Sequence, residues 1–339
     1  MDSSFPTISV ALCTYNGFAH LLTQWQSLLN QEILPNEVII SDDKSSDGTQ
    51  DLLNTLAADA PFRVRVLKNK ARLGYNKNFE QALAACTGDL IFICDQDDYW
   101  MPEKIRVMTQ YMVQHPEAQL AFCNAWVTDE NLQGRQKHVW DVVRFDQKTQ
   151  SRWQSGEMLD VLLDGNRMMG CATVVRHSFL PTLLPIPERV PGYIYDGWLA
   201  LVAATQNAVH FINQSLQLYR THVQQQVGVR EQPVGDLVSI RDRFTRHRAR
   251  KLAPLRKVQR QLTIISQLLR KRVSPNSPGL PQLDRRLAHF TLRSYLPQNR
   301  LKRIKPVLLN LWQGNYQRYA DPSANWYAPL LAVLGDILE

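Results

Sequence analysis

The sequence has no run of 18 apolar residues, and it begins without the charged and then apolar stretch of a secretory signal. These two absences predict a protein with no membrane-spanning helix and no secretory leader. No internal repeat is visible either. The 44% of apolar and 21% of charged residues are typical of a globular protein and argue against disorder.

Cysteine is scarce, with five in 339 residues, and none of them forms a C-x-x-C pair. Two of the five lie in apolar runs of strand character. This pattern predicts reduced, buried thiols in a cytosolic protein. The five are Cys13, Cys86, Cys94, Cys123 and Cys171.

Acidic residues are nearly absent from one segment. Between Arg241 and Lys305, 19 lysines and arginines stand against 2 acids, a local charge of +17. Because the whole chain carries +8, the remainder carries −9. The pattern predicts an acidic body with a basic C-terminal region. Such a region favours an anionic partner, which could be a membrane surface, a nucleic acid or an acidic glycan.

The first hundred residues alternate between two hydrophobic periods. Short apolar runs of strand length are followed by segments with apolar residues at helical spacing. This alternation is typical of a parallel sheet covered by helices on both faces. Strands are expected at Ile8–Cys13, Glu37–Ser41, Arg63–Leu67 and Leu90–Cys94, and helices at His20–Asn30, from an Asp47/Gln50 capping box through Ala58, at Asn76–Cys86, and from Pro102 to about Gln114.

Past Leu120 the pattern is less regular, and from Glu231 only helices are expected. We therefore expect an α/β domain over residues 1–230 and a basic, mostly helical region over 231–339. Within that region, Arg256–Arg270 places Val258, Leu262, Ile265 and Leu269 on one face, with basic residues opposite. Before it, strands are expected at Leu120–Val127, Thr173–Val175 and within Ala208–Tyr219, and helices at Gly156–Leu163 and Asp196–Ala204.

Three polar clusters directly follow predicted strands. They are TYNG at Thr14–Gly17, SDDKSSDGT at Ser41–Thr49 and DQDDYW at Asp95–Trp100. Each falls at the carboxyl end of a parallel strand, the edge at which open α/β sheets bind their ligands. Two acidic loops and a glycine turn converging on one edge predict a site there.

The DQDD segment is the sharpest of these features. Asp95 and Asp97, one residue apart, can face a common point from an extended segment. Carboxylates this close repel each other unless a cation lies among them, and oxygen ligands favour Mg²⁺ or Mn²⁺. The alternative is a solvated acidic turn that precedes the helix at Pro102.

The Asp42–Asp43 pair also has two interpretations. It can belong to a turn and helix cap, for which the SSDG that follows is well suited. Alternatively, Asp43 can face the crevice and accept hydrogen bonds from a nucleobase or a ribose.

Four segments together resemble the family 2 glycosyltransferases of the GT-A fold. They are VALCTYNG, EVIISDDKSSDGT, NKARLGYNKNFEQAL and GDLIFICDQDDYWMPEKI, in order and at fitting intervals, within about Ile8 to Gly228. The resemblance implies a nucleotide-sugar donor and a DxD-type metal site at Asp97, with Asp95 adjacent. It also implies a nucleotide pocket at Thr14, Tyr15, Asn16 and Asp43, with Arg72 and Asn78 lining the donor site.

Two later segments extend the resemblance. YDGWLA at Tyr195–Ala200 stands where the family keeps its catalytic base, which makes Asp196 the candidate. The family often has an acidic pair there, whereas Tyr195 precedes this Asp. The alternative is a helix N-cap.

YRTHVQQQVG at Tyr219–Gly228 resembles the YRxHxxNxxG segment of rhamnosyltransferase-like members, with its Asn replaced. This similarity implies that Arg220 lies at the donor and His222 at the diphosphate or the metal. A structural or surface histidine is the alternative.

The combined implication is an inverting, metal-dependent glycosyltransferase. Asp196 would take the proton from an acceptor hydroxyl as it attacks the anomeric carbon from the face opposite the leaving diphosphate. The resemblance implies dTDP-rhamnose or a UDP-sugar as donor. The acceptor would be a glycan or lipid-linked precursor of a bacterial surface polysaccharide or lipopolysaccharide.

Two rival functions are open to the same sequence. A non-catalytic GT-A scaffold could bind partners through its basic region, but the intact Asp95, Asp97 and Asp196 argue against it. A nucleotidyltransferase usually carries a glycine-rich, lysine-containing loop after its first strand, and TYNGFAH lacks one.

The aromatic residues and the apolar stripe of the basic region indicate which anionic partner it binds. Phe244, Phe290 and Tyr295 are too sparse to form a stacking platform for nucleic acid. A basic helix with an apolar stripe favours an anionic membrane. We therefore expect a cytoplasmic protein held peripherally on the inner face of the cell membrane.

Overall fold

The computed structural model describes residues 5–135, 137–223, 225–228, 248–321 and 325–338. The chain divides into two compact units, Met1–Glu231 and Gln232–Glu339. Among the described residues, no helix combines the length and apolar character needed to cross a membrane. All five cysteines are buried and free, as the sequence predicts.

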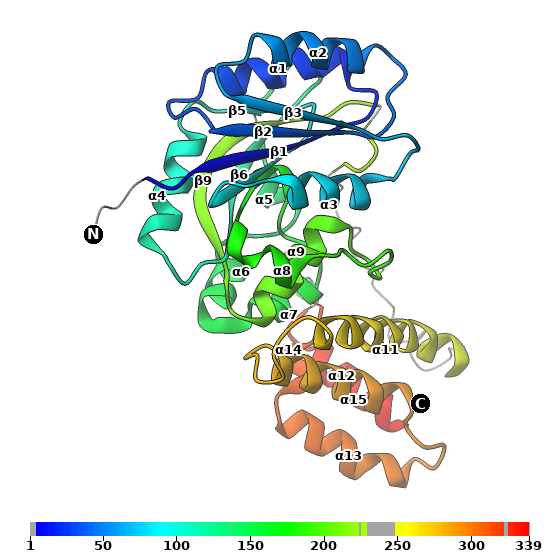
Figure 1. The fold of residues 1–339 in the computed structure, drawn as a ribbon. Helices are drawn as coiled ribbons and strands as arrows, with labels where there is room; N and C mark the ends of the chain where they lie inside the picture. The colour runs from blue at the N-terminus through cyan, green and yellow to red at the C-terminus, as the bar shows by residue number, and fades with distance from the viewer. Residues whose placement is uncertain (1–4, 136, 224, 229–247, 322–324, 339) are drawn as a thin grey trace. The chain divides into compact units, whose positions relative to one another are not determined.

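Four parallel strands form the first half of the sheet in unit 1. They lie in the order β3-β2-β1-β4 (Figure 1). β1 is central and buried at every position, which explains its mostly apolar sequence, whereas the edge strand β3 is partly exposed. The strands are β1 (Ile8–Thr14), β2 (Glu37–Asp42), β3 (Arg63–Lys68) and β4 (Leu90–Cys94).

Helices connect these strands and cover both faces. In Figure 1, α1 and α2 lie on one side of β1, β2 and β3, and α3 lies on the other. Each helix begins and ends within a few residues of its prediction, although α2 has Gly48 as its N-cap instead of the expected Asp47/Gln50 capping box. The helices are α1 (Phe18–Leu29), α2 (Thr49–Ala58), α3 (Tyr75–Ala85) and α4 (Lys104–Gln114).

The second half makes the sheet mixed, where the sequence predicts a mostly parallel one. β8 pairs antiparallel with β4 and β6, β9 is parallel to β6, and β5 and β7 join antiparallel. Strands of two to four residues contain too few side chains to indicate their direction, which is decided by pairing partners far along the chain. The strands are β5 (Tyr99–Trp100), β6 (Leu120–Thr128), β7 (Lys137–His138), β8 (Thr173–Arg176) and β9 (Val209–Arg220).

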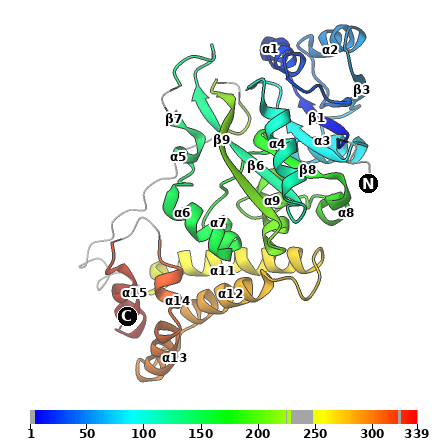
Figure 2. The ribbon, with the colours of Figure 1, turned by 90° about the vertical axis from the view of Figure 1, so that its left-hand side faces the viewer.

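β6 and β9 run side by side through the middle of this half (Figure 2). The buried helix α9 contributes the residue expected as catalytic base, and its eleven positions are all buried. The helix expected from Gly156 starts later because Gly156 has a φ of 90° and interrupts the helical path. The helices are α5 (Val139–Val142), α6 (Gln147–Arg152), α7 (Met158–Leu163), α8 (Leu180–Leu183) and α9 (Tyr195–Thr205), with single turns at Trp153–Glu157, Gly170–Ala172 and His177–Phe179.

All regular secondary structure in the described part of unit 2 is helical, as expected. The apolar stripe of α11 does not face outward: Leu262, Ile265 and Leu269 are only 3%, 2% and 0% exposed. These three residues of the stripe are therefore covered by protein, whereas the sequence predicts a membrane-facing surface there. The helices are α11 (Arg248–Arg270), α12 (Leu280–Ser294), α13 (Leu301–Trp312), α14 (Asn315–Arg318) and α15 (Ala328–Leu338).

The burial of this stripe predicts how two single substitutions on α11 affect stability. Leu269→Ala should lower the free energy of unfolding by about 2–5 kcal/mol, because it leaves a cavity in a fully buried site. The matched substitution Ile264→Ala removes a side chain that is 43% exposed and should change stability by no more than about 0.5 kcal/mol. Denaturant unfolding of both variants measures the difference. Equal losses would show that the stripe is not packed as described.

Candidate functional site

Two loops at the carboxyl edge of the sheet are joined by the side chain of Gln96. Its Oε1 accepts a hydrogen bond of 2.8 Å from the backbone N–H of Tyr15, and its Nε2 donates to the Tyr15 carbonyl at 3.0 Å. A Cβ on Gly17 would come within 2.2 Å of Gln96 Oε1, so only glycine allows this close approach. The TYNG and DQDD loops therefore form one surface.

The loop after β2 is tied to the loop after β1. Thr14 Oγ1 donates to Asp42 Oδ2 at 2.8 Å, and Asp42 Oδ1 accepts from Gln50 Nε2 at 2.6 Å. Asn16 has a φ of 47° and bonds this loop twice, with its backbone N–H to Ser45 Oγ and its Oδ1 to the Ser46 N–H, both at 2.9 Å. Thr14 and Asn16 thus act here as links between loops.

Asp43 organises the segment that contains Arg72. Its carboxylate is buried and accepts from the backbone N–H groups of Leu73 at 2.6 Å and Gly74 at 2.9 Å. The Arg72 guanidinium in turn lies 3.9 Å from the centre of the Tyr15 ring. Tyr15 and Arg72 therefore meet at the exposed rim of the site, where they can contact a ligand.

Asn78 is buried and bonded to the framework. Its Nδ2 donates to the Ser41 carbonyl at 2.9 Å, and its Oδ1 accepts from Ser41 Oγ at 2.7 Å and Asn69 Nδ2 at 3.0 Å. In this structure Asn78 supports the end of β2. Asn78 therefore shapes the donor site only indirectly, through the loops that it holds in place.

Asp97 and His222 are in direct contact although they are 125 residues apart in the sequence. His222 Nε2 lies 2.9 Å from Asp97 Oδ2, and the two side chains are 5% and 16% exposed. The His222 ring also packs on His20, with centroids 4.5 Å apart. Among the described residues, His222 Nδ1 has no hydrogen-bond partner although it is buried. Two of the three expected metal ligands are therefore neighbours.

Arg220 fixes the position of this pair. Its Nε donates to the Asp97 carbonyl at 2.7 Å, and its backbone N–H donates to Asp98 Oδ1 at 3.2 Å. Its Nη1 donates to the Glu130 carbonyl, while the buried Nη2 has no hydrogen-bond partner in the described part of the chain. Most of the guanidinium thus supports the DQDD loop, and Nη2 is the nitrogen left for a ligand.

Three buried residues behind this loop have no role predicted from the sequence: Asp98, Lys104 and Gln217. Asp98 accepts from Gln217 Nε2 at 3.3 Å, and its burial raises its pKa to about 7. Lys104 is fully buried, donates to Gln217 Oε1 and to the Cys171 carbonyl, and stacks over Trp100. A lysine at the start of an amphipathic helix carries no sequence signal of burial, so only the structure could find it.

Asp95 lies among several carboxylates. Burial raises its pKa well above the usual range, and the charges of Asp97, Asp98 and Asp196 raise it further. The ligand atoms of Asp95, Asp98 and Cys171 lie within 4.8 Å of one another. A divalent cation would offset this concentration of negative charge, and carboxylate oxygens are donors that Mg²⁺ and Mn²⁺ accept. The carboxylates of Asp95 and Asp98 therefore fit such an ion, whereas Asp97 and His222, the other expected ligands, are not part of this group of described residues.

Asp196 lies in the first turn of α9, next to these carboxylates. The N-cap of α9 is Ile194, so the interpretation of Asp196 as an N-cap is wrong. Its carboxylate accepts from the backbone N–H groups of Gly197 and, at 3.3 Å, Gly170. Burial raises its pKa to about 6, and these hydrogen bonds limit the increase. It is ionised at neutral pH while retaining enough basicity to accept a proton.

Comparison with known proteins finds several similar chains. The chain is 32% identical over 226 residues to an uncharacterized glycosyltransferase of Nostoc sp., covering 63% of this chain and 65% of that protein. It is 25% identical over 235 residues to dTDP-rhamnosyl transferase RfbG of Shigella flexneri, covering 64% and 73%. An uncharacterized protein of Mycobacterium tuberculosis is 28% identical over 217 residues, and the chain spans 59% of its length.

Among solved structures, S. aureus TarS 1–349 in complex with UDP-GlcNAc superposes with a TM-score of 0.55 at 14% identity. The match covers 98% of this chain and 88% of that one. At this identity the likeness shows the fold, which is the GT-A fold expected from the sequence. Residues 9–177 match the Glycosyl transferase family 2 domain. The chain therefore carries a glycosyl transferase family 2 domain.

Proposed function

We propose that this protein is an inverting, metal-dependent glycosyltransferase. It moves a sugar from a nucleotide-sugar donor to a hydroxyl of a bacterial surface-polysaccharide or lipopolysaccharide precursor. The observation that carries the proposal is the contact of Asp97 with His222, 2.9 Å apart, beside Asp95 and the basic carboxylate of Asp196. These groups supply charge stabilisation and a proton acceptor on one surface.

In this proposal the donor binds across the loops at the carboxyl edge of the sheet. The Tyr15 ring and the Arg72 guanidinium, which stack at the rim, contact the nucleotide. Thr14, Asn16, Asp43 and Asn78 hold the loops that form the pocket. The relative RfbG is a dTDP-rhamnosyl transferase by name, which supports dTDP-rhamnose as donor, with UDP-sugars as the other candidates.

Asp97, Asp95 and His222 are the groups that would hold a divalent ion. When bound there, Mg²⁺ or Mn²⁺ would neutralise the charge that develops on the departing diphosphate. Arg220 orients Asp97 through its main-chain carbonyl and has Nη2 available for a diphosphate oxygen. The carboxylates thus act on the leaving diphosphate through the ion that they would hold, and the Arg220 guanidinium adds a positive charge close to it.

Asp196 acts as the general base. It is 8% exposed, and its carboxylate is close enough to Asp95 to raise the pKa of that residue. Asp196 accepts the proton of the acceptor hydroxyl while the oxygen attacks the anomeric carbon, and the diphosphate leaves on the opposite face. The single displacement inverts the configuration at that carbon.

The first test removes the metal site. Asp97→Ala should abolish release of nucleoside diphosphate from the donor and weaken Mn²⁺-dependent nucleotide binding, since it removes a carboxylate that contacts His222. Asp51→Ala, an exposed carboxylate on α2, should behave as wild type. Full activity in excess EDTA would rule out metal dependence. Nucleotide binding without any sugar transfer by the wild type would instead indicate a non-catalytic scaffold.

The second test concerns the base and its pH dependence. Asp196→Asn should lower turnover by roughly 10²-fold or more with donor binding nearly unchanged, because the amide cannot accept the proton. In the wild type, turnover should fall as pH decreases through about 6, because Asp196 becomes protonated below its raised pKa. Wild-type turnover in Asp196→Asn would place the base elsewhere.

We also propose that unit 2 holds the protein peripherally on an anionic membrane, as a lipid-linked acceptor requires. Because the α11 stripe is buried, the surface for this role is on α13. Leu301, Leu308 and Trp312 are 77%, 47% and 85% exposed and lie on one side of that helix. Lys302 and Lys305 are exposed on the same helix. Apolar side chains flanked by lysines are typical of helices that lie in the membrane interface.

Vesicle sedimentation tests this surface. The double variant Leu308→Glu/Trp312→Glu should lose binding to anionic vesicles, and Lys302→Glu/Lys305→Glu should weaken it, because each basic residue near the surface contributes about 1 kcal/mol. Leu330→Glu/Leu334→Glu on α15 is the matched control, since both residues are 48% exposed. Equal binding to neutral and anionic vesicles, or loss of binding only in the α15 variant, would contradict the proposal.

A further inference from the structure

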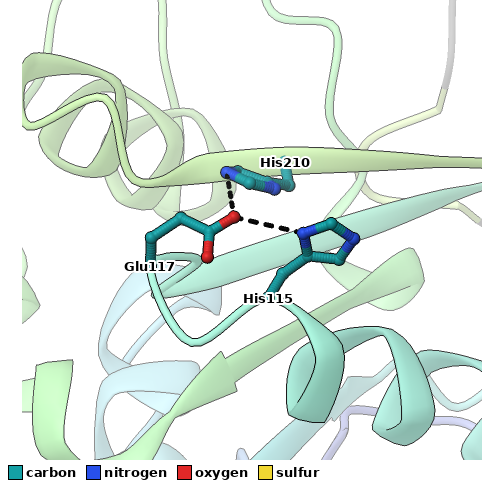
Figure 3. A group of neighbouring side chains, drawn as sticks. All are labelled: His115, Glu117 and His210. Carbon is teal, nitrogen blue, oxygen red and sulfur yellow. Dashed lines mark hydrogen bonds and ion pairs between the residues drawn. The ribbon is translucent and has the colours of Figure 1, made fainter.

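Two histidines and a glutamate gather at the end of the sheet opposite to the site described above. His115 directly follows α4, Glu117 lies in the loop to β6, and His210 is the second residue of β9. Figure 3 shows the Glu117 carboxylate between the two imidazole rings. Along β9, His210 is separated from Arg220 by roughly 30 Å of strand. The group therefore lies apart from the carboxylates around Asp97.

The spacing of the three side chains is close to that of a coordination sphere. Glu117 Oε1 lies 3.1 Å from His115 Nδ1 and 3.9 Å from His210 Nε2. One ligand atom from each residue lies within 4.8 Å of the other two. In a tetrahedral zinc site with bonds near 2.0–2.1 Å, ligand atoms lie about 3.3 Å apart. Small side-chain rotations would bring these atoms to that separation.

A second observation concerns the orientation of His210. The Tyr111 hydroxyl lies 3.1 Å from His210 Nδ1, on the side of the ring away from Glu117. Such a contact to the outer nitrogen of a histidine is the usual way in which proteins fix the ligating nitrogen.

We propose that His115, Glu117 and His210 form a binding site for Zn²⁺ or another borderline divalent cation. Three protein ligands leave a fourth position for water. The imidazoles select such a cation over Mg²⁺ or Mn²⁺, which the carboxylates near Asp97 prefer. This site goes beyond the proposed transfer reaction and does not depend on it.

The position of the site indicates what a bound cation would do. It joins the carboxyl end of α4 to the amino end of β9. α4 begins just after the DQDD loop, and β9 ends at Arg220, which holds that loop. A cation would therefore connect the two elements that carry the loop and its anchor, and it would stabilise unit 1 against unfolding.

Co²⁺ is a suitable probe because its visible absorption reports nitrogen and oxygen ligands in a site of low coordination number. The wild type should bind one equivalent with this absorption, and Zn²⁺ should displace it. His115→Gln and His210→Gln should each weaken binding at least 10-fold, and Tyr111→Phe should weaken it less. His177→Gln, an exposed histidine elsewhere in unit 1, is the matched control and should bind as wild type.

Thermal unfolding supplies a second measurement. Zn²⁺ should raise the unfolding temperature of the wild type and of Asp97→Ala, whose substitution lies in the other site, but not that of His115→Gln or His210→Gln. The proposal is overturned if the wild type gives no Co²⁺ absorption, or if both histidine variants keep it. Loss of the absorption in Asp97→Ala alone would assign the bound Co²⁺ to the carboxylate site and also overturn it.

Discussion

The site depends on one junction, between the carboxyl end of β9 and the DQDD loop. Arg220 donates to the carbonyl of Asp97 and, through its backbone, to the carboxylate of Asp98. His222, two residues further on, then contacts the side chain of Asp97. This junction fixes Asp97 and His222 against each other, because both belong to loops beyond the ends of their strands, β4 and β9.

The same junction concentrates negative charge where water is largely excluded. Asp95, Asp98 and Asp196 all have raised pKa values, mainly because burial disfavours their charged forms. Burying them costs stability, and Lys104 and backbone N–H groups offset only part of that cost. Proteins retain such arrangements at functional sites, where the unbalanced charge is available to a ligand. The DQDD loop therefore differs from a solvated acidic turn.

In the loops around Tyr15 and Arg72, by contrast, the buried carboxylates are balanced by hydrogen-bond donors. Asp42 and Asp43 are both buried, and their oxygens are used by hydroxyl, amide and backbone donors of the surrounding loops. These carboxylates therefore shape the pocket, and the half-buried Tyr15 and the exposed Arg72 present the contact surface. Asp42 and Asp43 thus organise the loops of the site, whereas the carboxylates of the DQDD loop concentrate negative charge within it.

In unit 2, burial changes the role expected from an apolar pattern in the sequence. The apolar stripe of α11 is inside, whereas α13 exposes leucines and Trp312 beside its lysines. A single helix with one apolar face does not indicate whether protein or lipid covers that face. Tertiary packing decides it, since burial by protein removes the stripe from any external surface.

The sequence by itself determined the strands β1 to β4, the helices between them and the three polar loops at the carboxyl edge, because these features depend on local periodicity and adjacent residues. Recognition of the family rested on the same local segments. The tertiary structure decided the mixed direction of the sheet, the contact of Asp97 with His222, 125 residues apart, and the burial of Lys104. It also brought His115 and His210 together and made framework residues of Asp43 and Asn78. Each of these depends on pairing between distant segments, which no local pattern records.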